Sequence, residues 1–119
     1  MLNLKYIHVT LIYILFMSII SHIPNDSLPD SDISFSAQDK IFHLIEFIVL
    51  GILLQLSFIE RSIFSNREII FMTVICGFSI ACIDELHQSF VVGRHSSIND
   101  LLFDFLGLLL SFLNYKNFY

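Results

Sequence analysis

Residues 39–58 read DKIFHLIEFIVLGILLQLSF, and this stretch decides the fold class. An α-helix needs about 20 mainly apolar residues to cross the hydrocarbon core of a bilayer, which is the length of the stretch. Its charged residues all lie before residue 47, so one half is almost purely apolar and the other half carries polar groups. The stretch therefore predicts a membrane-spanning helix with one polar end.

Three more apolar runs surround this stretch and predict helices over about residues 7–23, 68–87 and 98–113. The segment 24–38 holds both prolines of the chain, three aspartates and four serines, which is typical of a surface loop. Charged residues make up 14% of the chain, whereas a soluble domain has about 25%. We therefore expect one domain over residues 1–119, an all-α four-helix transmembrane bundle.

Serines and glycines mark the ends and the faces of the predicted helices. Three serines stand three residues before an acid, which is the spacing of a capping box at a helix start. These pairs are Ser36 with Asp39, Ser65 with Glu68, and Ser97 with Asp100. The last three helices carry one glycine each, Gly51, Gly77 and Gly107, and small residues let helices approach closely. The glycines predict either a tight bundle or a contact between copies in a homo-oligomer.

The positions of the basic residues predict the topology. Of the six Lys and Arg residues, four lie near one set of helix ends, namely Lys5, Arg61, Arg67 and Lys116. The other two, Lys40 and Arg94, lie near the opposite ends among acids. Because cytoplasmic segments carry the excess of Lys and Arg, we expect both termini in the cytoplasm, an N-in/C-in arrangement. The scattered basic residues form no stripe of the kind that binds nucleic acid.

Polar residues of three predicted helices then meet at the non-cytoplasmic side. Within each helix they recur at i, i+4 or i+7 and so share one face. The sets are Asp39, His43 and Glu46; Asp84 and Gln88; and Asp100 and Asp104. An acid at the centre of a span costs at least about 2.5 kcal/mol, so the deeper acids should face the bundle interior. We expect His43, Asp84 and His87 as catalytic residues, and Lys40, Glu46, Glu85, Gln88, Arg94, Asp100 and Asp104 as ligand-binding residues.

The residue types indicate roles within this group. His43 and His87 have acidic neighbours and would act as general base, with Asp84 as an orienting partner or a metal ligand. Glu85 points away from Asp84 on the helix and is expected to be exposed at the interface. The glycine before Arg94 permits a sharp turn, which would bring Arg94 over the group as a clamp.

Two of the acids also have a purely structural interpretation. Asp39 and Asp100 both suit the start of a helix, where a carboxylate accepts backbone N–H groups and meets the positive end of the helix dipole. Capping and ligand binding are compatible, so each acid keeps both roles as predictions.

Three motifs stand out along the chain, DKIFHLIEF at 39–47, DELHQSF at 84–90, and Gly93-Arg94 followed by Asp100-x-x-x-Asp104-x-x-Gly107. Together they resemble the VanZ-like family of bacterial membrane proteins. They follow one another in family order over residues 39–110. The resemblance implies a multi-pass protein of the bacterial cytoplasmic membrane and, through the protein that names the family, a part in resistance to the glycopeptide teicoplanin.

Two positions depart from the family pattern. Val92 stands where the family usually has proline, which leaves the loop less restrained. Asp104 stands where the family usually has asparagine, and it adds negative charge to the site. Six carboxylates then face two permanent cations, so a bare phosphate would be repelled. Either some acids are protonated, or a divalent metal is bound, or the ligand carries an amine or sugar hydroxyls.

We expect an envelope function, in which the protein acts on or binds a lipid-linked or cell-wall-related molecule at the outer leaflet and confers antibiotic tolerance. Membrane lipids are the expected partners and a divalent metal is a candidate cofactor, while the residues leave open whether the protein is an enzyme. The alternatives are a non-catalytic membrane modifier, a small proton-coupled exporter, or a cluster that only ties helices together. The exporter is less favoured because the acids lie at one end of the bundle rather than near the midplane.

Overall fold

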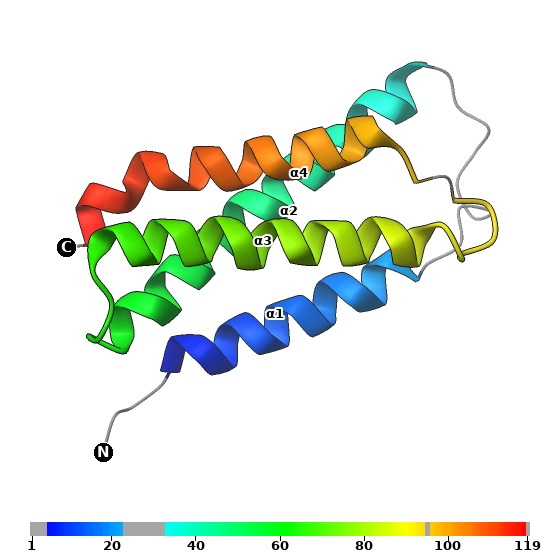
Figure 1. Cartoon of the computed structure of the whole chain (residues 1–119). Coiled ribbons are helices and arrows are strands. Elements are labelled where there is room, and N and C mark those ends of the chain that lie inside the picture. The colour runs from blue at the N-terminus through cyan, green and yellow to red at the C-terminus, as the bar shows by residue number, and fades with distance from the viewer. Residues whose placement is uncertain (1–4, 23–32, 95, 119) are drawn as a thin grey trace.

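The computed structural model describes residues 5–22, 33–94 and 96–118, and the regular structure in these residues is all helical. Four α-helices follow one another along the chain, with a short 3-10 helix after the fourth (Figure 1). They are α1 (Lys5–Ser21), α2 (Ile33–Glu60), α3 (Asn66–Gln88), α4 (Ile98–Ser111) and the 3-10 helix η2 (Phe112–Phe118). The predicted all-α, four-helix fold is confirmed.

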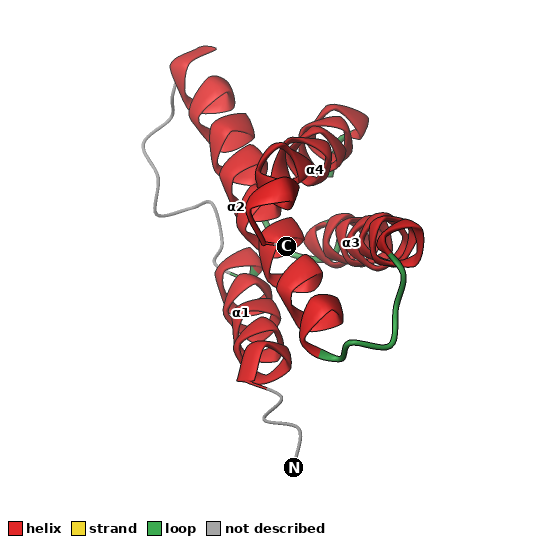
Figure 2. Cartoon of the chain, turned by 90° about the vertical axis from the view of Figure 1, so that its left-hand side faces the viewer, coloured by secondary structure: helices red, strands yellow, loops and turns green. Residues whose placement is uncertain are grey.

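Helix α2 is the centre of the bundle. It packs against α1, α3 and α4, most extensively against α4. Figure 2 shows α1 on one side of α2, and α3 and α4 on the other. The apolar core lies where these helices meet, with Phe47, Leu50 and Leu54 of α2 packed with Ala81 of α3 and Leu108 of α4. Burial of these side chains fixes how the helices are rotated, and thus which polar residues face one another.

Three helical segments are long and apolar enough to cross a membrane, namely Ala37–Glu60, Asn66–Gln88 and Ile98–Asn117. Helix α1 is also apolar, but it is shorter, with 17 residues. The outer side of α1 exposes a row of large hydrophobic side chains, Leu11, Ile12, Leu15, Phe16 and Ile19. A surface of this kind is unfavourable in water. Length, composition and surface therefore all indicate a membrane protein.

The start of α2 differs from the prediction. The sequence predicted a helix from Asp39 with Ser36 at its cap, whereas α2 begins at Ile33. Both residues lie within the helix, so the cap assignment is wrong for Ser36 and Asp39. The physical reason is that residues 33–38 contain neither Pro nor Gly, so nothing in them stops a helix. Residues 24–32 of the predicted loop lie outside the described residues.

The other two serines cap their helices as predicted, but only Ser65 completes a capping box, because the Ser97 backbone N–H donates to Glu85. Ser65 and Glu68 make a complete capping box at the start of α3, in which each side chain accepts from the other residue's backbone N–H. Ser97 precedes α4 and accepts the backbone N–H of Asp100 at 3.1 Å. The start of α4 is thus fixed beside the predicted site.

The three helix glycines are packing contacts within the chain. A Cβ at Gly107 would lie 2.6 Å from the backbone oxygen of Leu44, and one at Gly77 would lie 2.5 Å from Leu108 Cδ2. A Cβ at Gly51 would overlap the Ser111 side chain. Helices α2, α3 and α4 therefore approach closely at these positions, which confirms the prediction of a tight bundle.

Neutral hydrogen bonds tie the helices together away from the predicted site. Thr10 Oγ1 of α1 lies 2.8 Å from Ser57 Oγ of α2, and Gln55 Nε2 of α2 donates to Ser111 Oγ of α4 at 2.8 Å. These contacts show that the bundle holds its helices in register with uncharged groups.

Candidate functional site

Four acids from the start of α2, the end of α3 and the start of α4 surround the imidazole ring of His43. We call Asp39, His43, Glu85, Asp100 and Asp104 the His43 cluster. His43 is its centre. Each of the four acids has a carboxylate oxygen within 4.8 Å of a ring nitrogen of His43.

The shortest contact in the cluster joins His43 to Asp104. His43 Nδ1 lies 2.8 Å from Asp104 Oδ1, and the two side chains are 5% and 0% exposed. Their helices approach closely at Gly107, one turn from Asp104, which brings the pair within hydrogen-bond distance. The second oxygen of Asp104, Oδ2, has no hydrogen-bond partner in the described part of the chain. The contact fixes the ring and leaves its other nitrogen, Nε2, available.

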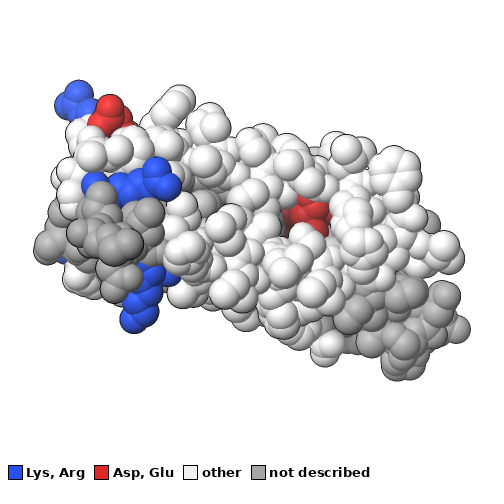
Figure 3. Space-filling model, turned by 90° about the horizontal axis from the view of Figure 1, so that it is seen from below, with Lys and Arg blue, Asp and Glu red and all other residues white. Residues whose placement is uncertain are grey.

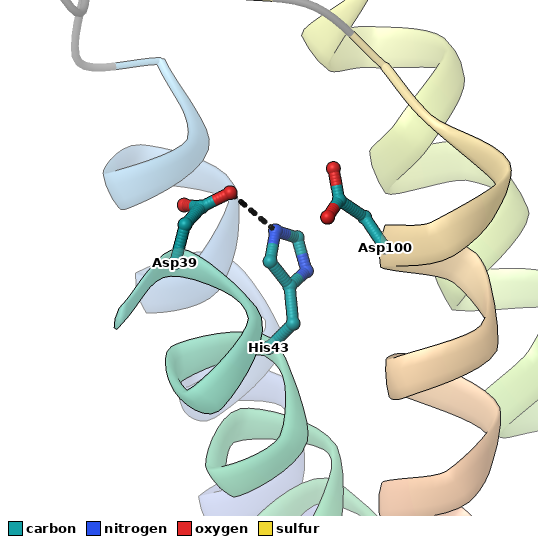
Figure 4. A group of neighbouring side chains, drawn as sticks. All are labelled: Asp39, His43 and Asp100. Atoms are coloured by element: carbon teal, nitrogen blue, oxygen red, sulfur yellow. Dashed lines mark ion pairs between the residues drawn. The ribbon is translucent and has the colours of Figure 1, made fainter. Parts of the chain in front are cut away.

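The Nε2 side of the ring is flanked by two more acids. Asp39 Oδ2 lies 3.9 Å from His43 Nε2, and Figure 4 shows the carboxylates of Asp39 and Asp100 on either side of the imidazole. The Asp39 side chain is 40% exposed, so the cluster is accessible here. Asp39 is therefore a site residue by position, although it caps no helix.

Glu85 is buried, and its predicted exposure at the interface is wrong. It is 8% exposed, and its Oε2 accepts the backbone N–H of Ser97 at 3.2 Å. Its other oxygen, Oε1, has no partner among the described residues. The chain between α3 and α4 turns back over the end of α3, and this brings the start of α4 onto Glu85. Helical spacing within α3 alone does not reveal that contact.

Asp84 belongs to a second polar group, which joins α3 to α1. Ser21 Oγ donates to Asp84 Oδ1 at 2.5 Å, and Gln88 Nε2 donates to Asp84 Oδ2 at 3.0 Å. Both carboxylate oxygens are thus satisfied by neutral donors. The orienting partner of His43 is Asp104, and Asp84 instead joins α1 to α3.

The sequence interpretation missed two residues of α1 and of the turn after it. His22 Nε2 lies 3.0 Å from His87 Nε2, and the two rings lie with their centroids 4.0 Å apart. Ser21 is the donor to Asp84 described above. The available signal was Ser21-His22, two adjacent polar residues that end an otherwise apolar run.

The predicted cations do not neutralise the His43 cluster. Lys40 Nζ lies 5.9 Å from the centroid of the Phe103 ring. Arg94 follows Gly93, whose φ of 80° makes the predicted sharp turn, and it is half-buried within electrostatic range of Glu46. Within the described residues neither cation forms an ion pair. Glu46 is half-buried, and its backbone oxygen accepts the Tyr13 hydroxyl at 3.0 Å.

The geometry of the cluster suits two kinds of chemistry. An imidazole that is hydrogen-bonded to a carboxylate through one nitrogen can accept a proton at the other, as a general base does. The same nitrogen can instead bind a metal ion, with the carboxylate orienting the ring. Two sets of side chains are spaced to hold such an ion, Asp39, His43 and Asp100, and His43, Glu85 and Asp104.

Comparison with known proteins identifies one family. The model of the VanZ/LLP1 family matches residues 2–119. No curated protein and no solved structure matches the chain. The match extends the motif resemblance of residues 39–110 to both flanking segments, including α1 and the turn after it, which supply Ser21 and His22. The chain therefore belongs to the VanZ/LLP1 family.

Proposed function

We propose that this protein binds or acts on an envelope lipid or a lipid-linked cell-wall molecule at the outer leaflet of the bacterial cytoplasmic membrane. The observation that carries the proposal is the buried His43–Asp104 pair, which lies in an acidic cluster open on its Asp39 side. Tolerance to a glycopeptide antibiotic such as teicoplanin follows if the molecule concerned takes part in the action of the antibiotic.

The distribution of charge supports the orientation. Lys5 begins α1, Arg61 follows α2, Arg67 lies in the first turn of α3 and Lys116 lies in η2, so all four lie at the same end of the bundle. Figure 3 shows Lys and Arg gathered at one end, and an acidic patch recessed among uncharged side chains farther along. By the positive-inside rule the cationic end is cytoplasmic, so the His43 cluster faces outward.

A purely structural role accounts poorly for the cluster. Ionisable side chains are costly in a membrane, whereas the neutral pairs Thr10–Ser57 and Gln55–Ser111 hold helices together elsewhere in this bundle. The cluster also leaves Glu85 Oε1 and Asp104 Oδ2 without partners among the described residues. Unsatisfied buried acceptors weaken a bundle, so we assign them to the binding of something outside the chain.

The proposed site combines an accessible polar centre with a surrounding lipid-facing surface. A lipid-linked molecule would place its acyl chains against the exposed apolar sides of the helices and its polar head against Asp39 and His43. Because the cluster is acidic, the head carries an amine or hydroxyl groups, or any phosphate it has is shielded by a cation. In a catalytic version, the cluster activates water or a substrate hydroxyl for hydrolysis or group transfer.

The test is a comparison of bacteria that lack the protein with bacteria that express the wild type, His43→Ala or Asp104→Ala. We expect the wild type to raise teicoplanin tolerance, and both variants to lose the effect while they accumulate in the membrane normally. His8→Ala is the matched control, because His8 is an exposed histidine near the start of α1, far along the chain from the cluster. Full tolerance in both variants, or no tolerance with the wild type, would refute the proposal.

Profiles of lipids and cell-wall precursors from the same strains separate catalysis from binding. A species that changes with the wild type and not with His43→Ala indicates a reaction. An unchanged profile together with lost tolerance indicates a non-catalytic membrane modifier.

A further inference from the structure

Three side chains on the open side of the His43 cluster are spaced for one cation. One ligand atom each of Asp39, His43 and Asp100 lies within 4.8 Å of the others, and Asp39 Oδ2 is 3.9 Å from His43 Nε2. A tetrahedral ion that binds imidazole nitrogen and carboxylate oxygen at about 2.0–2.2 Å holds its ligand atoms about 3.3–3.6 Å apart. Small side-chain movements therefore bring all three onto a single ion.

The orientation of the imidazole suits metal binding at Nε2. Asp104 Oδ1 lies 2.8 Å from Nδ1, on the far side of the ring from Asp39. Metal-ligating histidines usually donate the N–H of their second nitrogen to a carboxylate or a carbonyl, and this contact fixes the tautomer. With the proton on Nδ1, the lone pair of Nε2 points toward Asp39, and the Asp100 carboxylate lies on the other side of the ring (Figure 4).

Asp100 gives an independent indication of a missing ligand. The residue is 6% exposed, no hydrogen bond from the described residues reaches its carboxylate, and the carboxylate points toward the ring (Figure 4). Its backbone N–H donates to Ser97 Oγ, which holds the residue in this place. A carboxylate that belongs to a largely buried residue and has no protein donor is stabilised by a cation.

The negative charge of the His43 cluster also calls for a bound cation. Four carboxylates surround one imidazole, and neither Lys nor Arg pairs with any of them within the described residues. On the Nδ1 side of the ring, Glu85 Oε1 and Asp104 Oδ2 are buried and lack donors in the part of the chain that the structure describes. A divalent cation on the Nε2 side of the ring offsets two negative charges at once.

We propose that Asp39, His43 and Asp100 bind one divalent transition-metal ion, with Asp104 as a positioning residue that orients the imidazole. The presence of an imidazole ligand favours Zn²⁺ or a similar ion over Mg²⁺ and Ca²⁺, which prefer oxygen alone. Three protein ligands leave a coordination position open for water or a substrate group. His43 is then a ligand, and water on the ion supplies the nucleophile that the side chains of the site lack.

The metal site goes beyond the lipid-directed function and is tested without any lipid substrate. The full chain, purified in detergent and stripped with a chelator, is titrated with Zn²⁺ in a calorimeter, and with Co²⁺, whose visible absorption reports the ligand geometry. We expect saturable binding of one ion per chain. His43→Ala, Asp39→Asn and Asp100→Asn should each weaken binding at least about 10-fold, and Asp104→Ala about 10- to 100-fold.

Two comparisons keep the result interpretable. His8→Ala should bind as the wild type does, which excludes binding by this exposed histidine. Asp39→Asn changes a partly exposed residue, so its folding, checked by circular dichroism, should remain intact. Absence of one-to-one binding, or binding unaffected by all three ligand variants, would overturn the proposal. Loss in Glu85→Gln with full binding in Asp39→Asn would also overturn it, because the ion would then lie on the Nδ1 side of the ring.

Discussion

Asp84 and Asp104 are both buried aspartates on neighbouring helices, yet their surroundings differ. Each oxygen of Asp84 accepts from a neutral donor, Ser21 on one side and Gln88 on the other. Asp104 has one oxygen against His43 and one without a partner among the described residues. A satisfied carboxylate needs nothing more from its environment, whereas an unsatisfied one does. We therefore assign a structural role to the Asp84 group and a binding role to the His43 cluster.

The largest expected effect concerns the orienting contact of the His43 cluster. Asp104→Ala removes the acceptor of the Nδ1 proton, so we expect tolerance or turnover to fall about 10- to 100-fold. Asp104→Asn keeps an amide oxygen there and should recover most of the loss. Activity is compared at equal protein levels in the membrane. If the asparagine variant is as defective as the alanine variant, the hydrogen bond is not the feature that matters.

The next largest effect is expected at Gly107, where the close approach of α4 to α2 holds the His43 cluster together. A Cβ at Gly107 would meet the Leu44 backbone oxygen at 2.6 Å and Phe47 Cβ at 3.0 Å, and neither atom can move freely. Gly107→Ala should therefore cost about 1–3 kcal/mol of stability and separate α4 from α2. Unfolding in mixed detergents measures the loss.

Gly77→Ala is the matched control for Gly107→Ala, because the three atoms nearest to its Cβ would belong to the Leu108 side chain and none to the backbone. We expect a smaller loss of stability there and little loss of function. Equal losses at the two glycines would contradict the account of α2–α4 packing.

A smaller effect is expected at Asp84, the satisfied aspartate of the comparison. Asp84→Ala removes the acceptor shared by Ser21 and Gln88, and side-chain hydrogen bonds within membranes are worth about 0.6 kcal/mol each. We expect a stability loss of about 1 kcal/mol and unchanged Zn²⁺ binding per folded molecule. Lost activity at unchanged stability would instead return Asp84 to the catalytic role that its sequence position predicted.

The fold was largely predictable from the sequence, because apolar runs and the absence of helix breakers are local properties. The same rule explains the error at α2, where residues 33–38 look polar enough for a loop but contain nothing that stops a helix. The capping serines Ser65 and Ser97 were recognisable for the same local reason.

The pairing within the site was not predictable in this way. Helical spacing placed His43 and Asp104 on polar faces, but their contact depends on the rotation of α2 against α4, which core packing and Gly107 determine. The burial of Glu85 depends on the turn between α3 and α4. Contacts between helices that are distant in the chain carry no local signal.

The smallest effect compares two caps of the same kind at opposite ends of the bundle. Ser97→Ala and Ser65→Ala each remove a side-chain acceptor at a helix start, so each should cost about 0.5–1 kcal/mol of stability. Only Ser97 positions a site residue, because its Oγ accepts the Asp100 N–H and its own N–H donates to Glu85. We therefore expect weaker Zn²⁺ binding in Ser97→Ala and unchanged binding in Ser65→Ala, measured by the same titration. If both variants bind Zn²⁺ equally well, the start of α4 does not tune the site, and Asp100 is held in place by helix packing alone.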